Sequence, residues 1–259
     1  MIVVDSGLGG ISVVRALRAA SPDIALTYIA DTAGFPYGRL DADVIGARAE
    51  RILRRAAAIQ HPGAVVVACN TLSTLCLDRL RAAFPFPFVG TVPAVKVAAL
   101  TFPRFTLLAT PNTAHSAYSQ DLIARFAGSA TVDCVGAPGL AVWAERMLLG
   151  LGGDRAELSA ELAPAFKDDA RGRTGAIVLG CTHYPLIVDA LRDAAPWPVR
   201  WIDSGAAIAR RVWAVSPRRG GPAGDGSSVA YVTAPADVAL YDGVFRREGF
   251  QQIEVLDPE

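Results

Sequence analysis

Short apolar runs alternate with longer segments rich in Ala, Leu and Arg along most of the chain. The longer segments, such as ISVVRALRAA from residue 11 and DVIGARAERILRRAAAI from residue 43, predict helices. Strands alternating with helices favour βαβ units, and therefore an α/β fold with mostly parallel sheets. The predicted strands are MIVV, ALTYIA, AVVVA, FPFVG, FTLLA, TVDCV, GAIVL, VRWI and VAYVT.

The apolar runs are continuous rather than alternating with polar residues. Continuous Val, Ile and Leu are typical of strands that are covered by helices on both faces. One later stretch breaks the pattern: residues Ser216 to Ser228 read SPRRGGPAGDGSS, rich in Gly, Pro and Ser. This composition predicts an exposed loop before the VAYVT strand.

A weak internal repeat runs through the polar positions that follow the strands. VVDSGLGG at the start of the chain has a counterpart in WIDSGAAIA near Asp203, and VVACNT has one in VLGCTH. Each copy is a strand followed by a turn and the start of a helix. Ligands of open α/β sheets bind at the carboxyl ends of strands, so two facing lobes would bring these turns together.

Composition narrows the class of protein. The chain has 259 residues, 52% of them apolar, which is enough for two domains or one large α/β unit. Its 25 basic and 25 acidic residues balance, so nucleic acid and anionic membranes are excluded as main partners. No membrane span and no signal peptide is recognisable, and we expect a cytoplasmic chain whose four cysteines stay free thiols.

Two of the four cysteines stand at strand ends. Cys76 and Cys134 lie within apolar helical and strand patterns and are expected to be small core residues. Cys69 and Cys181 each end a strand and precede a predicted helix, where backbone N–H groups and the helix dipole favour a thiolate. We therefore expect Cys69 and Cys181 to be reactive.

Several chemistries need such thiols. A zinc site would need three or four ligands, and Cys69, Cys181 and His183 would supply three, but no CxxC or HxxxH spacing supports a metal. A Cys–His hydrolase needs only one cysteine, so the second would be unexplained. Two opposed thiols suit a reaction in which one removes a proton from a carbon and the other returns one to the opposite face, inverting the stereocentre.

Two polar turns add candidate binding groups. DSGLGG, from Asp5, lacks the third glycine of a dinucleotide loop because Ser12 stands there. Its strand-to-helix turn still offers N–H groups to a small anion such as a carboxylate, with Asp5 as an acceptor for an ammonium group or as an acid–base partner. In ADTAGFPYG, Pro36 and Gly38 fix a turn that would let Tyr37 close a pocket.

These motifs together resemble a known family. DSGLGG, DTAGFPYG, ACNTLS, ATPNTAHSAY, LGCTHYPL and DSGAAIARR occur in the order seen in glutamate racemases, within the cofactor-independent aspartate/glutamate racemase superfamily. The resemblance runs from about residue 2 to residue 211. It implies two flavodoxin-like α/β domains related by pseudo-twofold symmetry, with the substrate between them. One domain would comprise residues 1–90 plus 205–259 and carry Cys69, and residues 91–204 would carry Cys181.

The resemblance also implies the site. Cys69 and Cys181 would be the two catalytic bases, and Asp5, Asp31, Glu145 and His183 match positions thought to assist proton transfer. ACNTLS departs from the usual motif, with Leu72 in place of a small residue, and the stretch before Glu145 is looser than in the family. The implied substrate contacts are Asp5, Ser6, Tyr37, Gly38, Asn70, Thr71, Thr113, Thr182 and His183.

The implied activity is interconversion of L- and D-glutamate without cofactor or metal, supplying D-glutamate for peptidoglycan and hence for cell-wall biogenesis and cell shape. Glutamate would be the small-molecule partner, and a homodimer stays open because apolar surface cannot be told from core. The lobes are expected to hinge near Gly90 and Asp203. The alternatives are an aspartate or hydantoin racemase, a maleate isomerase, or a catalytically silent amino-acid-binding protein.

Overall fold

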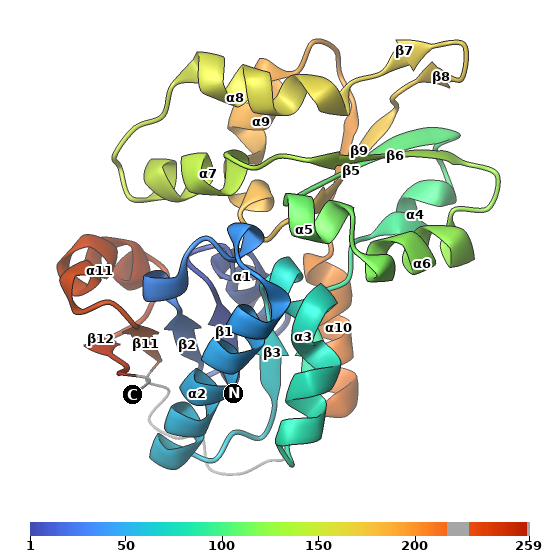
Figure 1. Ribbon diagram of the computed structural model, residues 1–259. Coiled ribbons are helices and arrows are strands. Elements are labelled where there is room, and N and C mark those ends of the chain that lie inside the picture. The colour runs from blue at the N-terminus through green and yellow to red at the C-terminus, as the bar shows by residue number, and fades with distance from the viewer. Residues whose placement is uncertain (217–227, 258–259) are drawn as a thin grey trace.

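The computed structural model describes residues 1–216 and 228–257 and has two parallel sheets, which confirms the predicted α/β class (Figure 1). The first sheet has the order β12 (Gln252–Val255), β11 (Val229–Val232), β2 (Thr27–Ala30), β1 (Ile2–Asp5), β3 (Val65–Val67) and β4 (Phe88–Gly90). The second has the order β10 (Arg200–Ile202), β9 (Ala176–Gly180), β5 (Arg104–Ala109) and β6 (Thr131–Gly136).

Helices cover both faces of the first sheet, which explains its continuous apolar strands. Along β1, Val3 packs on one face, and Ile2 and Val4 pack on the other. We call this sheet with its helices the first lobe. Its Val3 face is covered by α1 (Ile11–Ala20), α10 (Gly205–Val215) and α11 (Val238–Arg247), and its other face by α2 (Ala42–Ile59) and α3 (Asn70–Ala83).

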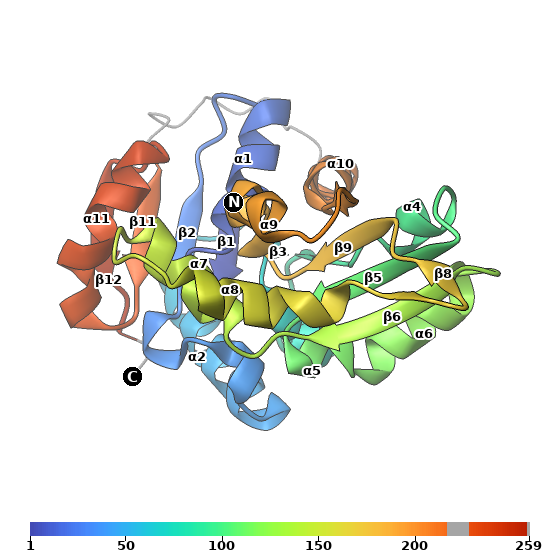
Figure 2. The same ribbon diagram turned by 90° about the horizontal axis from the view of Figure 1, so that it is seen from above.

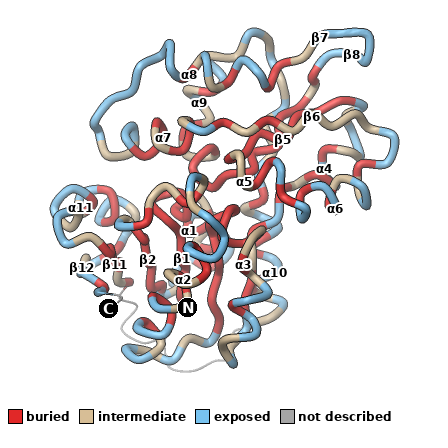
Figure 3. The backbone as a smooth tube through the Cα atoms, viewed as in Figure 1, coloured by how far each residue is buried: buried red, intermediate tan, exposed pale blue. Residues whose placement is uncertain are grey.

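The second lobe is built in the same way. Leu108 of β5 packs with one helical layer, and its neighbours Phe105 and Leu107 pack with the other. Figure 3 shows the buried backbone concentrated along the strands of both lobes, with the outer helical turns and loops exposed. The two helical layers are α7 (Leu140–Leu148), α8 (Arg155–Leu162) and α9 (Val188–Ala194) on one face, and α4 (Val95–Ala99) and α6 (Ala117–Phe126) on the other.

The chain crosses between the lobes after β4 and again after β10. The two crossings touch, since the Ser204 hydroxyl donates a hydrogen bond of 2.6 Å to the carbonyl of Val92. The strands of the first sheet come from residues 2–90 and 229–255, and those of the second from residues 104–202. The exact domain boundaries at 90/91 and 204/205, and hinging there, stay predictions.

Every strand predicted from an apolar run is present, but three short ones were missed. β12 is mostly exposed, and β7 (Asp168–Asp169) and β8 (Gly172–Arg173) form an exposed two-residue hairpin, so none of them has an apolar run. The loop predicted from Ser216 to Ser228 lies almost wholly outside the described residues. Within the described ranges, every helix is too short or too polar to cross a bilayer.

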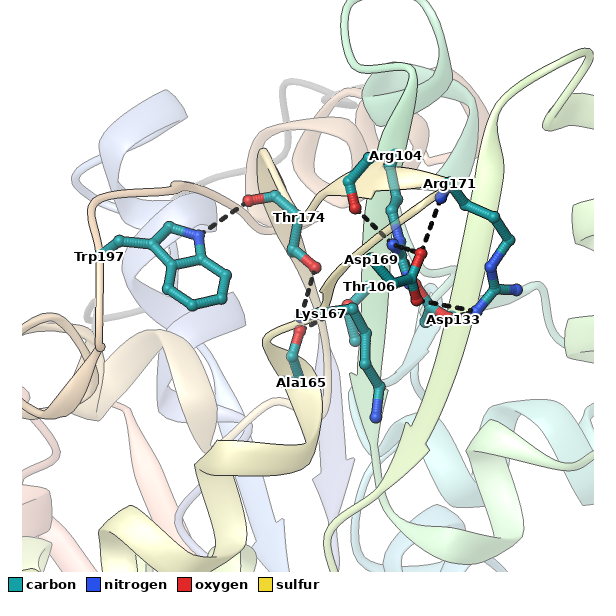
Figure 4. A network of polar contacts seen from close by, with 10 residues as sticks. Arg104, Thr106, Asp133, Ala165, Lys167, Asp169, Arg171, Thr174 and Trp197 are labelled. Carbon is teal, nitrogen blue, oxygen red and sulfur yellow. Dashed lines mark hydrogen bonds and ion pairs between the residues drawn. The ribbon is translucent and has the colours of Figure 1, made fainter.

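A buried cation anchors the β7–β8 hairpin to the second sheet (Figure 4). Arg104, at the start of β5, is 1% exposed. Its guanidinium donates to Asp133 at 2.8 Å, to Asp169 at 2.7 Å and to the carbonyl of Gly172 at 2.5 Å. Arg171 adds outer ion pairs to both carboxylates. This Arg104 cluster lies at the amino end of β5, away from the carboxyl ends where the candidate catalytic residues stand.

Candidate active site

The two candidate cysteines stand at carboxyl ends of central strands, one in each lobe. Cys69 lies two residues beyond β3 and is the N-cap of α3, and Cys181 directly follows β9. Both are buried, each 6% exposed. The element after Cys181 is the short 3-10 turn η4 (Tyr184–Ile187), with α9 behind it, so the expected α-helix N-terminus is present at Cys69 only.

Polar contacts connect the surroundings of the two thiols across the lobes. The Ser6 hydroxyl lies 3.9 Å from the sulfur of Cys69. Its neighbour Asp5 accepts a 3.0 Å hydrogen bond from the hydroxyl of Thr182, the residue after Cys181. The carboxyl ends of β1, β3 and β9 therefore meet at one place, as the repeat of motifs predicted.

A glycine makes this close approach of the lobes feasible. A Cβ added at Gly9 would lie 2.5 Å from the Thr182 hydroxyl and 2.5 Å from Nδ1 of His183, both in the other lobe. Real Cβ atoms do not come that close to heavy atoms, so any larger residue at position 9 would push the lobes apart. Gly9 of DSGLGG thus serves lobe packing as well as the turn.

Burial decides the ionisation of Asp5 and Cys69. Desolvation raises the pKa of Asp5 to about 6, against the opposing influence of His183 and of hydrogen bonds from Gly7 and Thr182. Burial, and next the charge of Asp5, raise the pKa of the Cys69 thiol well above its ordinary value. The expectation that the helix N-terminus favours a thiolate at Cys69 is therefore wrong, because desolvation outweighs the helix dipole.

Cys181 has a different environment, because His183 lies beside it. The ring nitrogen Nδ1 of His183 is 3.7 Å from the sulfur of Cys181, and Nε2 is 2.7 Å from a carboxylate oxygen of Glu145. Burial alone would lower the pKa of His183, but its hydrogen bonds to Cys181 and Glu145 and the charge of Glu145 outweigh burial, so the pKa lies well above its ordinary value. His183 therefore places a group with a raised pKa within 3.7 Å of the sulfur of Cys181.

The N–H groups of DSGLGG have protein partners. Gly7 N–H donates to Asp5 at 3.1 Å, and Leu8 N–H donates to both oxygens of Glu145, at 3.1 and 3.0 Å. The sequence predicted that this turn holds a small carboxylate. A carboxylate is there, but it belongs to Glu145 of the second lobe.

Asp31 holds the turn that contains Tyr37, and its assistance to proton transfer stays a prediction. One of its oxygens accepts from the Tyr37 hydroxyl at 2.6 Å, and both accept from Arg48, at 2.8 and 2.7 Å, with Thr233 donating to Oδ1 at 2.7 Å. Burial acts to raise the pKa of Asp31, but the hydrogen bonds from Arg48, Tyr37 and Thr233 outweigh it and the pKa is lowered. Asp31 therefore stays ionised and fixes Tyr37 and the 3-10 turn η2 (Tyr37–Arg39).

Hydroxyl groups from both lobes converge next to these residues. Thr71 of the first lobe lies 3.0 Å from Thr110 and 3.3 Å from Thr113 of the second, oxygen to oxygen. A Cβ added at Gly38 would meet Thr110 at 2.9 Å, so η2 also reaches this cluster. Asn70 begins α3 beside them, and its buried amide oxygen has no hydrogen-bond partner among the described residues.

A cavity of about 170 Å³ adjoins the site. Asn70, Cys181 and Thr182 contribute to its wall, which continues along α1 to the second crossing at Ser204. An unpaired amide oxygen and a cluster of hydroxyls are groups that a small polar ligand would satisfy. Within residues 1–216 and 228–257, no three His, Cys, Asp or Glu side chains are grouped to hold a metal ion.

All the sequence-predicted site residues lie at this junction of the lobes, but three others were missed. Thr110 lies within ATPNTAHSAY and follows β5, so its position at a strand end was a usable sign. Arg48 and Tyr241 gave no sign in the sequence, because each lies inside an ordinary helical pattern. Arg48 pairs with Asp31, and the Tyr241 hydroxyl donates to Glu145 at 2.7 Å.

Comparisons with known proteins agree with this geometry. The Asp/Glu/Hydantoin racemase family model matches residues 11–212. Glutamate racemase from Brucella canis is 46% identical over 222 residues, covering 85% of this chain and 80% of that protein. The crystal structure of Escherichia coli glutamate racemase, in complex with L-glutamate and the activator UDP-MurNAc-Ala, is 34% identical with a TM-score of 0.90, covering 99% of this chain and 97% of the other.

The fold is shared with more distant enzymes as well. Glutamate racemase from Thermus thermophilus, in complex with β-chloro-D-alanine, is 27% identical with a TM-score of 0.72, covering 99% of this chain and 96% of that one. The chain belongs to the Asp/Glu/Hydantoin racemase family, a class of isomerases. Within that family it groups with the glutamate racemases, as its sequence motifs predicted.

Proposed function

We propose that this chain interconverts L- and D-glutamate by a two-base mechanism that uses Cys69 and Cys181 and no cofactor. The observation that carries the proposal is the placement of the two buried thiols at facing strand ends of opposite lobes, in a chain 46% identical to a glutamate racemase. One sulfur takes the α-proton as a thiolate, and the other returns a proton to the opposite face as a thiol.

The surroundings of the two thiols support an asymmetric starting state. Burial and the charge of Asp5 raise the pKa of Cys69 and favour its thiol form, whereas His183, whose own pKa is raised, lies 3.7 Å from the sulfur of Cys181. The resting enzyme is then ready for the enantiomer whose α-proton faces Cys181. After that turnover Cys69 is the thiolate and Cys181 the thiol, which is the form that the other enantiomer needs.

The carbanion next to a carboxylate needs stabilisation by preorganised groups in a water-poor site. The hydroxyls of Thr71, Thr113 and Thr182 are suited to a substrate carboxylate, and the unpaired oxygen of Asn70 to the ammonium group. Ser6, Tyr37 and Gly38 would complete the pocket, with Tyr37 held by Asp31. Asp5, Glu145 and His183 would assist proton transfer by setting the charge around the thiols.

We also propose the cellular setting that follows from this activity. D-glutamate is a building block of peptidoglycan, so the enzyme would act in cell-wall biogenesis, in the cytoplasm. A homodimer stays a proposal that sedimentation equilibrium would test directly.

Exchange of the α-proton with solvent tests the mechanism. In D₂O, wild-type protein incubated with L- or D-glutamate should place deuterium at the α-carbon and produce the opposite enantiomer. Cys69→Ala and Cys181→Ala should each lose racemisation by at least about 10³-fold. Near-native racemisation by both variants would refute the two-cysteine mechanism. Binding of glutamate without any exchange by the wild type would indicate a silent binding protein, and turnover of L-aspartate alone would indicate a sister racemase.

A further inference from the structure

Glu145 joins the two lobes through its carboxylate. Within its own lobe it pairs with His183. From the first lobe it receives the N–H of Leu8 and the hydroxyl of Tyr241, at 2.7 Å. Glu145 is 3% exposed, and in the described part of the chain His183 is its only ion-pair partner. Its orientation therefore depends on donors from the opposite lobe.

Tyr241 is held firmly in the first lobe. It lies in α11, which Figures 1 and 2 show next to α7, the helix of Glu145. Its ring packs against Phe245 with 6.2 Å between centroids, inside the core that also contains Val3 of β1. Leu148 and Leu149, at the end of α7, pack against the same core. The hydroxyl is thus presented to Glu145 only while α7 is docked on α11.

We propose that Tyr241 is a positioning residue which couples proton transfer at Cys181 to closure of the lobes. This inference rests on the function proposed above. In the closed state the Tyr241 hydroxyl and the Leu8 N–H hold the Glu145 carboxylate so that one oxygen receives Nε2–H of His183. When the lobes separate, both donors leave with the first lobe, and the carboxylate is free to turn away from His183.

The effect is confined to one of the two thiols. The titratable groups that face His183 are Glu145 from α7, Cys181 beside it and Asp5 from β1. In the described part of the chain, Cys69 has no comparable series of side chains, and the polar side chain next to its sulfur is Ser6 at 3.9 Å. Loss of the Tyr241 hydroxyl should therefore weaken proton transfer at Cys181 and leave proton transfer at Cys69 unchanged.

Elimination from a β-chloro analogue of glutamate isolates one thiol at a time. The cysteine takes the α-proton and chloride leaves from the β-carbon as the C=C bond forms, so one base is enough. Two single-cysteine variants serve as backgrounds for the test. Cys69→Ala retains only Cys181 as a base, and Cys181→Ala retains only Cys69. Each is assayed with the enantiomer of the analogue whose α-proton its remaining cysteine removes. Chloride release is measured between pH 6 and 10 with and without Tyr241→Phe. The matched control is Tyr231→Phe, since the Tyr231 hydroxyl has no hydrogen bond among the described residues.

In the Cys69→Ala background, Tyr241→Phe should lower kcat for chloride release about tenfold. It should also shift the pH profile to lower pH, because His183 loses an oriented carboxylate. In the Cys181→Ala background, kcat should stay within twofold of its starting value, and the pH profile should not shift. Equal losses in the two backgrounds, no loss in either, or the same loss with Tyr231→Phe would each overturn the proposal.

A second variant keeps the proposal testable if Tyr241→Phe does not fold. Glu145→Gln in the same two backgrounds should give a larger loss, again on the Cys181 side only. Where both variants fold, the double variant should be no worse than Glu145→Gln alone, since Tyr241 acts through Glu145. Additive losses would overturn the coupling. If wild-type protein exchanges no α-proton of glutamate, the proposed function fails, and that result is distinct from any outcome in the single-cysteine backgrounds.

Discussion

The second lobe carries buried charge at both ends of its sheet, and the two ends are built differently. At the amino end of β5, Arg104 meets two carboxylates, Asp133 and Asp169. At the carboxyl end of β9, the buried carboxylates of Glu145 and of Asp5 from the first lobe have His183 as their only nearby cation among the described residues. Carboxylates meet a buried cationic residue in both places, but only the pair at the amino end is neutralised by arginine, and Asp169 there is partly exposed.

The pKa directions follow this difference. Hydrogen bonds from Arg104 hold the pKa of Asp169 well below its ordinary value, whereas burial raises that of Asp5 to about 6. A paired carboxylate stabilises the fold, and an unpaired buried one costs stability while keeping its protonation adjustable. The Arg104 cluster thus has the character of a structural anchor, whereas the lobe junction keeps the adjustable protonation that the proposed proton transfer would need.

Removing the cation should break the anchor. Arg104→Met leaves Asp133 and Asp169 with only the exposed Arg171 as an ion-pair partner and removes the hydrogen bonds that tie the β7–β8 hairpin to β5. We expect the free energy of unfolding to fall by about 2 kcal/mol, because the hydrogen bonds to Asp133 and to the carbonyl of Gly172 are lost; urea denaturation at pH 7.5 measures the change. The control, Arg15→Met, removes an ion pair whose arginine is 57% exposed and should cost less than about 1 kcal/mol. Similar losses in the two variants would show that burial of Arg104 is unimportant.

The sequence predicted the strands and the catalytic end of the sheet better than it predicted either charge cluster. Apolar runs and the polar motifs after them are local patterns, and Cys69, Cys181 and His183 were found in that way. Arg104 lies in an ordinary strand, and its partners Asp133 and Asp169 are 29 and 65 residues away in the sequence. Tyr241 is 96 residues from Glu145, so no local pattern could reveal that contact.

The pKa of Cys69 was mispredicted for a related reason. The helix N-terminus is visible in the sequence as a strand followed by a helical pattern, and it favours a thiolate. Desolvation and the charge of Asp5 depend on how the two lobes close over the site, and both act in the opposite direction. Local sequence therefore gave the smaller electrostatic influence, and tertiary packing decided the outcome.

Asp31 sharpens the comparison, because it lies next to the site but is paired like the Arg104 cluster. Asp31→Asn removes the charge that Arg48 pairs with and weakens the hydrogen bond from Tyr37. The free energy of unfolding at pH 7.5 should fall by about 2 kcal/mol. Since the folded-state pKa of Asp31 is lowered, this stabilisation is present above about pH 4 and is lost as pH falls towards the lowered pKa. Asp189→Asn, at an exposed ion pair, is the control. A loss that grows as pH falls would contradict the pairing.

Of the three variants, Asp5→Asn should change the free energy of unfolding least, and it should raise it where Arg104→Met and Asp31→Asn lower it. The folded-state pKa of Asp5 is about 6, against 3.8 ordinarily, so a stabilising contribution of the protonated form is complete below about pH 4 and is lost as pH rises through 6. An uncharged asparagine avoids that loss, which amounts to about 3 kcal/mol for a shift of roughly two units. The amide accepts less well from Gly7 and Thr182, which offsets about half of the gain.

The net expectation for Asp5→Asn is a gain of about 1.5 kcal/mol at pH 8, measured by urea denaturation, that disappears on lowering the pH to 4. Racemase activity should fall in the same variant, because the charge of Asp5 contributes to keeping Cys69 protonated. Stability and activity would then change in opposite directions at this residue, whereas at Arg104 a loss of stability should leave kcat of the folded enzyme unchanged. An Asp5→Asn protein that is less stable at pH 8 than at pH 4, relative to wild type, would show that Asp5 is neutralised by a partner after all, and the contrast between the two ends of the sheet would no longer hold.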